Sequence, residues 1–465
     1  MDDFEGLESL RDPSTIPNAP SLPVHILHQF IGLVAFGICF IPVVVYRTLT
    51  WIIPATRPHR SWTLRRSVAV SVGRLYLACT TYLSLPREPG AGMWKPDGLV
   101  HRLTGRRTKV KAVVVPPVKD EWIVSIAKAG DEYVGPVKVS CFWTFVEGGV
   151  WMEGDENAAP GEKVIMYVNG GSWVMGHPQS IMFPYKFAKI SGRRILGVNH
   201  RKALAPSTAF PAQLLDLLAG YAYLLSKGFA SENIVLIGDS SGGHLVLALS
   251  RYLSELNSVQ PGCEVGMPGA MLLISPSCDL SHPPCPTSAT DFLVPYLNQR
   301  VYPSLTRHFV PSAVKTSPYF SPAACGSFAY LATAQKGRPS RIQSPPLLSL
   351  SQLSESDKDR RLNLQTSPGD ARIDMKMDLH VQPKDALNST PGSGTQVWIQ
   401  YSSVENLHAD IEHLIERMRG DGVEVDVDRV EGGVHLDAGI AFALGERGEE
   451  SAWVRLCDAV RRYTR

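Results

Sequence analysis

The sequence lacks the features of several common classes of protein. Its 465 residues carry a formal net charge of only +2, so no basic excess supports a nucleic-acid partner. Its eight cysteines form no C-x-x-C pair, and they do not cluster with histidines at the spacing of a zinc site. We therefore expect no nucleic-acid partner and no metal site.

Aromatic residues are absent from one long stretch. No Phe, Trp or Tyr lies between Leu331 and Val397, and residues 326–394 as a whole are rich in Ser, Pro, Gln, Lys and Asp. A segment of this composition buries too little apolar surface to offset its ordering entropy. The composition predicts a disordered surface insertion over 326–394. Translated non-coding sequence from an imperfect gene model is the alternative.

Charge is missing from one apolar run near the N-terminus. Residues 30–46 read FIGLVAFGICFIPVVVY, and with its flanks the segment 24–54 exceeds the about 20 residues that cross a hydrocarbon core. Residues 1–23, expected to be disordered, carry five acidic side chains against one arginine, unlike the basic start of a secretory signal. The pattern predicts an uncleaved transmembrane anchor, with a signal peptide or a buried helix as alternatives.

Basic residues follow this run closely. The arginines after the span are Arg47, Arg57, Arg60, Arg65 and Arg66. The positive-inside rule places such residues in the cytosol, but the sequence leaves the side of the C-terminal domain open. We expect a single-pass protein of the endoplasmic reticulum membrane. A second apolar stretch, 67–85, contains Arg74, which favours a surface or lid helix over a second span.

From about residue 112 the chain alternates between runs typical of strands and of helices. The expected strands cover 137–146, 163–168, 194–199, 233–237, 269–275, 397–401 and 423–430, and the expected helices lie over 210–227, from 244 onward and over 407–418. This alternation predicts a mostly parallel sheet with helices on both faces. The intervening segment 55–111 is expected to be a connector with cap helices.

The most informative motif is Gly238-Asp-Ser-Ser-Gly-Gly243. It follows an expected buried strand and precedes an expected helix, which is the setting of a nucleophile elbow. Glycines around the serine allow strand and helix to approach closely, and the helix N-terminus directs N–H groups toward whatever the serine attacks. The motif predicts that Ser240 is a catalytic nucleophile.

A nucleophilic serine needs a base and an acid, and the residues after the last two expected strands supply both types. His435 lies in a Gly-flanked loop just beyond the strand over 423–430, so we expect it to act as the general base. Glu405 follows the strand over 397–401 and is the expected acid, with Asp410 as the rival. Asp279 follows an earlier strand and is expected to be structural.

The nucleophile also needs donors for the developing oxyanion. The strand over 163–168 runs directly into Asn169-Gly-Gly-Ser172, where two glycines let backbone N–H groups turn inward. We expect Gly170 and Gly171 to supply two donors and Ser241, the residue after the nucleophile, a third.

Four ordered blocks resemble those of the hormone-sensitive-lipase-like branch of the α/β-hydrolases, in particular its fungal membrane-anchored members related to steryl acetyl hydrolases. The blocks are NGGSWVMGHP (169–178), HRKALAPSTAFPAQLLD (200–216), GDSSGGHL (238–245) and SPYFSPA (317–323). The resemblance implies an α/β-hydrolase fold with a helical cap, for which 55–110 and 281–316 are candidates. Asn169 and Ser172 depart from the histidine and glycine of the family's first block.

The expected organisation and function follow from these observations. The segments are 1–23 (disordered), 24–54 (anchor), 55–111 (connector and cap), 112–325 (first part of the hydrolase domain), 326–394 (insertion) and 395–465 (second part). We expect a membrane-anchored serine ester hydrolase without a cofactor, acting on short-chain, acetyl-type esters of a lipophilic alcohol such as a sterol or fungal secondary metabolite. The alternatives are a non-catalytic anchored scaffold, or an acyltransferase or amidase that uses the same triad.

Overall fold

The computed structural model describes residues 22–81, 99–129, 134–148, 156–203, 208–260, 265–281, 317–332 and 394–465. The chain forms two compact units, one made of 1–332 with 394–465 and the other of 333–393. The second unit lies outside the described residues, as do the tail before residue 22 and the candidate cap segment 282–316.

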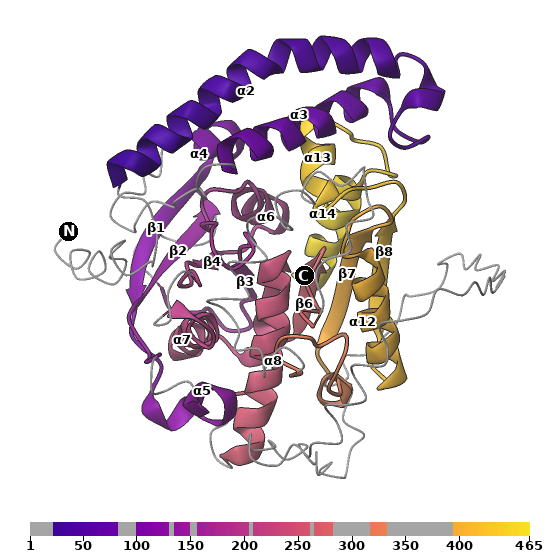
Figure 1. Ribbon diagram of the computed structural model, residues 1–465. Coiled ribbons are helices and arrows are strands. Elements are labelled where there is room, and N and C mark those ends of the chain that lie inside the picture. Colours follow the sequence, from indigo (N-terminus) through magenta and orange to yellow (C-terminus); the bar gives the residue numbers. More distant parts are fainter. Residues whose placement is uncertain are drawn as a thin grey trace, which may run out of the picture. The chain divides into compact units, whose positions relative to one another are not determined.

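An eight-stranded sheet organises the first unit, with the strand order β1-β2-β4-β3-β5-β6-β7-β8 (Figure 1). The strands are β1 (Thr108–Val115), β2 (Val139–Val146), β3 (Val164–Val168), β4 (Ile195–Val198), β5 (Ile234–Asp239), β6 (Ala270–Ile274), β7 (Gln396–Ser402) and β8 (Val425–Val430). The pairings of β1 with β2 and of β2 with β4 are antiparallel, and all the others are parallel. This confirms the expected mostly parallel sheet.

Helices cover both faces of the sheet. One face packs against α7 (Ala212–Ser226), α8 (Ser241–Val259) and α12 (His408–Gly420), and the other against α6 (Phe183–Ser191), α13 (Asp437–Ala443) and α14 (Ala452–Tyr463). The remaining α-helices described are α2 (Leu22–Trp51), α3 (Leu64–Thr81), α4 (Leu99–Thr104) and α5 (Ser125–Ala129). The helices expected over 210–227 and 407–418 are confirmed as α7 and α12.

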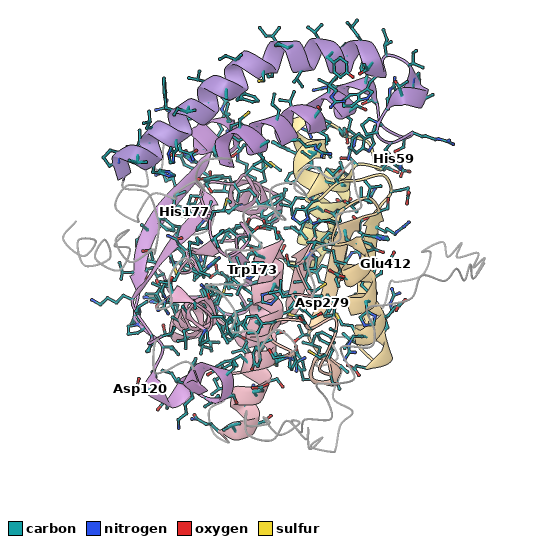
Figure 2. All side chains as sticks on the ribbon, viewed as in Figure 1. His59, Asp120, Trp173, His177, Asp279 and Glu412 are labelled. Carbon is teal, nitrogen blue, oxygen red and sulfur yellow. The ribbon has the colours of Figure 1, made fainter. Side chains whose placement is uncertain are left out.

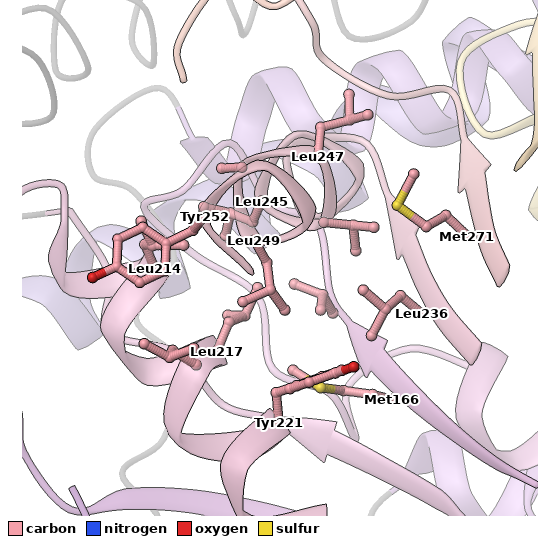
Figure 3. Packing of buried hydrophobic residues seen from close by; sticks show 14 of the residues in the cluster. Met166, Leu214, Leu217, Tyr221, Leu236, Leu245, Leu247, Leu249, Tyr252 and Met271 are labelled. Carbon is pink, nitrogen blue, oxygen red and sulfur yellow. The ribbon is translucent and has the colours of Figure 1, made fainter. Parts of the chain in front are cut away.

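The central strands are apolar along their whole length because each face of the sheet is covered. In β5, Leu236 faces the α7–α8 side while its neighbour Ile237 faces the opposite cluster. Figure 3 shows Met166, Leu236 and Met271, from three different strands, packed under the side chains of α7 and α8. Because β5 is packed on both faces, its last residue, Asp239, is held in place, and so is Ser240 directly after it.

Two expected boundaries are moved by the structure. The sheet begins with β1 at Thr108, inside the segment expected to be a connector. The sequence pattern did not indicate this edge strand, because Lys109 and Lys111 alternate with its apolar residues. The disordered insertion was expected from residue 326, but Phe328 and Leu331 are buried in the core of the first unit, which continues to Ala332.

The N-terminal apolar run forms α2, which is long and apolar enough to cross a membrane. Most of its large side chains are exposed, among them Phe30, Ile38 and Ile41. Its other face packs along α3, where the ring of Phe36 lies 5.5 Å from that of Tyr76. Of the stretch expected over 67–85, residues 67–81 belong to the helix α3, which runs beside α2 (Figure 1), and 82–85 lie outside the described residues.

Candidate active site

Ser240 occupies the turn between β5 and α8. Its φ of +53° is a left-handed conformation that a serine rarely adopts, and the turn holds it there because its N–H donates to the Ile274 carbonyl of β6 at 2.8 Å. Glycine is required on both sides. A Cβ on Gly238 would lie 2.5 Å from the carbonyl oxygen of Gly242, and one on Gly242 would lie 2.1 Å from that of Val168. The turn therefore has the tight geometry of a nucleophile elbow.

Three side chains that are far apart in the sequence meet at this turn. The Nε2 atom of His435 lies 3.0 Å from Oγ of Ser240, and its Nδ1 atom lies 2.6 Å from Oε2 of Glu405. His435 and Glu405 are only 1% and 4% exposed, whereas Ser240 is partly accessible. The structure thus brings together the three residues that the sequence singled out as nucleophile, base and acid.

Two further donors fix the Glu405 carboxylate. Its Oε1 atom accepts the backbone N–H of Ser402 at 2.8 Å and the hydroxyl of Ser275 at 3.1 Å, which leaves Oε2 for the imidazole. The Ser275 hydroxyl in turn accepts the N–H of Leu436 at 3.3 Å, so it links the acid to the loop that carries the base. The sequence analysis missed Ser275, whose only signal is its position directly after β6.

The candidate oxyanion loop lies against the elbow. A Cβ on Gly170 would lie 2.6 Å from the carbonyl oxygen of Asp239 and 3.0 Å from Cβ of Ser240. The Asn169 side chain donates from Nδ2 to the Gly170 carbonyl at 2.8 Å. Because the C=O and N–H of a trans peptide point in opposite directions, the N–H of Gly171 points away from the Asn169 amide. Asn169 therefore orients this peptide.

The same loop carries three consecutive residues with positive φ: Gly171, Ser172 and Trp173. Two hydrogen bonds from Trp173 hold this conformation, one from its N–H to Oγ of Ser241 at 3.2 Å and one from Nε1 to Nδ1 of His244 at 3.2 Å. Burial lowers the pKa of His244 to about 4, so its imidazole is neutral and able to accept. Trp173 lies beside the N-terminal end of α8 (Figure 2). Ser172, which stands where the resembled family's first block has a glycine, thus adopts a left-handed backbone conformation.

Asp239, the residue before the nucleophile, is fully buried. Its Oδ1 atom accepts the Tyr167 hydroxyl at 2.5 Å. Burial raises the pKa of this carboxyl to about 6, although the Tyr167 hydroxyl, the Gly170 N–H and the charge of His435 oppose the rise. Asp239 is therefore a second buried carboxylate beside the site. The sequence motif contained it, but nothing in the sequence indicated Tyr167 as its partner.

Comparison with known proteins agrees with this architecture. A family model described as the alpha/beta hydrolase fold matches residues 165–335. The solved structure of EstE5 soaked with ethyl alcohol aligns with a TM-score of 0.51 at 17% identity, over 87% of this chain and 99% of that chain, which shows a shared fold. This chain has the α/β-hydrolase fold.

Sequence relatives match part of this chain. An acetyl-hydrolase of Streptomyces hygroscopicus is 30% identical over 120 residues, 26% of this chain and 37% of that protein. A Schizosaccharomyces pombe protein provisionally named a steryl acetyl hydrolase is 29% identical over 140 residues, 29% of this chain and 35% of that protein. The chain spans little more than a third of the length of these curated relatives.

The other candidate residues of the hydrolase domain lie elsewhere or outside the described ranges. Asp410 is in the first turn of α12, and the carboxylate that faces His435 is that of Glu405. Asp279 follows β6 and accepts the Ser281 N–H at 2.8 Å, in a turn of its own. Within the described ranges, no group of three His, Cys, Asp or Glu side chains is arranged to hold a metal ion.

Proposed function

We propose that this protein is a serine ester hydrolase in which Ser240 is the nucleophile, His435 the general base and Glu405 the residue that orients and stabilises the base. The observation that carries the proposal is the continuous chain of contacts from the Ser240 hydroxyl through the imidazole to a buried carboxylate, at 3.0 and 2.6 Å. Such a chain lets a serine hydroxyl lose its proton as it attacks.

The first half of the reaction forms an acyl-enzyme. His435 takes the proton of Ser240 as Oγ bonds to the ester carbonyl carbon, and the carbonyl oxygen becomes an oxyanion. We assign its stabilisation to the N–H groups of Gly170, Gly171 and Ser241. Ser241 is the first residue of α8, so its N–H has no acceptor within the helix. The Gly170 N–H is shared with the Asp239 carboxylate. His435 then protonates the leaving alcohol, and the carbon–oxygen ester bond breaks.

The second half releases the acid. Water enters the place of the alcohol, gives a proton to His435 and attacks the acyl carbon, and the proton returns to Oγ of Ser240 as the bond to the serine breaks. Glu405 orients His435 and stabilises the imidazolium that forms twice in each turnover. The net reaction is ester plus water to acid plus alcohol, and this scheme needs no cofactor.

We propose acetyl esters of a lipophilic alcohol, such as a sterol, as the substrate class. Two relatives carry acetyl-hydrolase names, which supports a short acyl group. The exposed apolar surface of α2 supports attachment to a membrane, where a lipophilic ester concentrates. We assign α2 as a single-span anchor of the endoplasmic reticulum membrane.

A fluorophosphonate probe tests the proposal directly, because it labels only an activated serine. The full chain in detergent should be labelled and should hydrolyse p-nitrophenyl acetate, and Ser240→Ala should abolish both without changing Tm. Ser226→Ala, at the exposed end of α7, is the matched control and should behave like the wild type. An unlabelled wild type would indicate a non-catalytic scaffold, and ester products formed with added alcohols would indicate an acyltransferase.

A further inference from the structure

The loop that carries His435 is contacted by a segment that lies far away in the sequence. Residues 57–70, here called the clamp segment, connect the apolar helix α2 to the hydrolase domain and include the first two turns of α3. Its Trp62 is 2% exposed and donates from Nε1 to the carbonyl of Gly432, 370 residues later. Trp62 and Val70 form one apolar cluster with Val434, the residue before His435.

The clamp segment lies close to Gly432, whose backbone conformation favours glycine. Gly432 has a φ of +65°, and a Cβ there would lie 2.5 Å from Oγ of Ser61 and 2.8 Å from the ring of His59. His59 is labelled in Figure 2, beside the end of the domain that carries the β8 loop. The clamp segment therefore rests directly on the backbone three residues before His435.

A charge contact holds the other side of the same loop. The Arg66 guanidinium binds the carboxylate of Asp437 and also reaches Glu446 at 3.2 Å. The same Oδ1 atom of Asp437 accepts the N–H of Val434 at 2.9 Å. Asp437 is buried, so its charge needs the guanidinium as a partner. Arg66 thus acts on the peptide next to His435 through one carboxylate.

The clamp segment is also tied to the end of α2. Arg57 donates from Nε to the carbonyl of Trp51, the last residue of α2, at 3.0 Å and from Nη1 to the carbonyl of Trp62 at 2.9 Å. A continuous set of contacts therefore leads from the apolar helix to both sides of the His435 loop.

We infer that two residues of the clamp segment, Trp62 and Arg66, are positioning residues that hold the His435 imidazole against Ser240. This inference rests on the proposed function. It assigns a role in the reaction to the region next to the membrane-associated helix, outside the sheet that supplies the three reacting side chains.

The central test compares Arg66→Ala with Arg65→Ala in the full chain in detergent. Arg65 is the matched control, because it carries the same charge one residue earlier on α3 and is exposed. With p-nitrophenyl acetate, Arg66→Ala should lower kcat by about ten- to a hundredfold with KM within about twofold, as expected when a reacting group loses its alignment. Arg65→Ala should stay within twofold of the wild type, and Arg66→Lys should recover part of the loss.

The pH profile separates positioning from a general loss of structure. Burial raises the pKa of Asp437, and the nearby Glu446 and Glu405 add to the rise, while Arg66 and the Val434 N–H oppose it. Without Arg66 this pKa rises further, so Asp437 is protonated at a higher pH and loses its charge-assisted bond to Val434. The acid limb of the kcat/KM profile should move to higher pH in Arg66→Ala and stay in place in Arg65→Ala.

Trp62→Phe provides a conservative second variant if Arg66→Ala fails to fold. It keeps an aromatic ring in the apolar cluster but removes the N–H that binds Gly432 together with part of the indole, so kcat should fall severalfold with a small decrease in Tm. The inference is overturned if folded Arg66→Ala matches Arg65→Ala in kcat, or if its kcat falls together with Tm while the acid limb of the pH profile does not move. If Arg66→Ala does not fold, the inference is overturned when Trp62→Phe matches Arg65→Ala in kcat. A wild type that lacks activity and probe labelling would instead end the proposed function.

Discussion

Ser240 lies in the middle of the eight-stranded sheet, between β5 and α8, whereas His435 lies in a loop beyond β8 at the sheet edge. The Ser240 turn is fixed by its own strand neighbours, through the Ile274 carbonyl and the close packing of Gly238 and Gly242. The His435 loop is held partly by the N-terminal segment, through Trp62 and Arg66.

This difference indicates that the two halves of the site depend on different parts of the chain. Ser240 is positioned by the core that covers both faces of the sheet. His435 is positioned by contacts that cross from the segment after the apolar helix α2. Changes near α2 should therefore affect the base and leave the nucleophile in place.

The largest effect is expected where the two halves meet, at Glu405. Glu405→Gln removes the charge that stabilises the imidazolium of His435, so kcat should fall by about 10³- to 10⁴-fold. Steady-state hydrolysis of p-nitrophenyl acetate measures it. Asp410→Asn is the control, in the neighbouring helix, and should leave kcat within twofold. A large loss in Asp410→Asn with activity retained in Glu405→Gln would reassign the acid.

A smaller loss is expected on the nucleophile side, at Gly170. The added Cβ of Gly170→Ala would meet the backbone of Asp239 at 2.6 Å and push the oxyanion loop away from Ser240. We expect kcat to fall by about a hundredfold, the effect of one displaced oxyanion donor. Gly439→Ala, where nothing lies within 4 Å of the new methyl group, should be neutral. Wild-type kcat in Gly170→Ala would remove this loop from the oxyanion assignment.

The buried carboxyl group of Asp239, directly before Ser240, should make the stability of the protein depend on pH. Asp239 is bonded to a neutral tyrosine, and its pKa is raised to about 6. The folded state therefore binds a proton that the unfolded state releases between about pH 4 and 6, so the free energy of unfolding falls by about 3 kcal/mol as pH rises through this window.

Asp239→Asn has no such titration. The Tm of the wild type relative to Asp239→Asn should therefore fall from about pH 4 to 6 and then stay level, as measured by thermal unfolding in detergent. Tyr167→Phe keeps the carboxylate but removes a hydroxyl that lowers its pKa, so the fall in Tm should remain and extend to higher pH. A constant difference in Tm across this range would show that Asp239 does not titrate there.

The smallest effect concerns local stability. Hydrogen exchange should be faster at residues 432–436 than at 239–244, because the first loop lies at the sheet edge and the second is enclosed by the core. Trp62→Phe should raise exchange severalfold at 432–436 only, as expected for the loss of about 1 kcal/mol of one hydrogen bond. Equal protection of the two loops in the wild type would remove the contrast between them.

Much of this site can be predicted from short stretches of sequence. The elbow at Ser240 is recognisable because its glycines, strand and helix are neighbours in the chain, and Glu405 and His435 are recognisable because they follow strands whose order is fixed. β1 was missed because lysines alternate with its apolar residues. Tyr167, Trp62 and Arg66 have no local signal, and Ser275 has only its position directly after β6, since their partners lie 72 to 380 residues away.

The sequence by itself determined the fold class and predicted Ser240, Glu405 and His435 as the reacting residues in this order, because these features depend on periodicity and on glycines within a few positions. Only the tertiary structure decided which carboxylate faces His435 and that the segment after the apolar helix touches the loop of the base. Those contacts depend on how distant parts of the chain pack together, and no short stretch of sequence contains both partners.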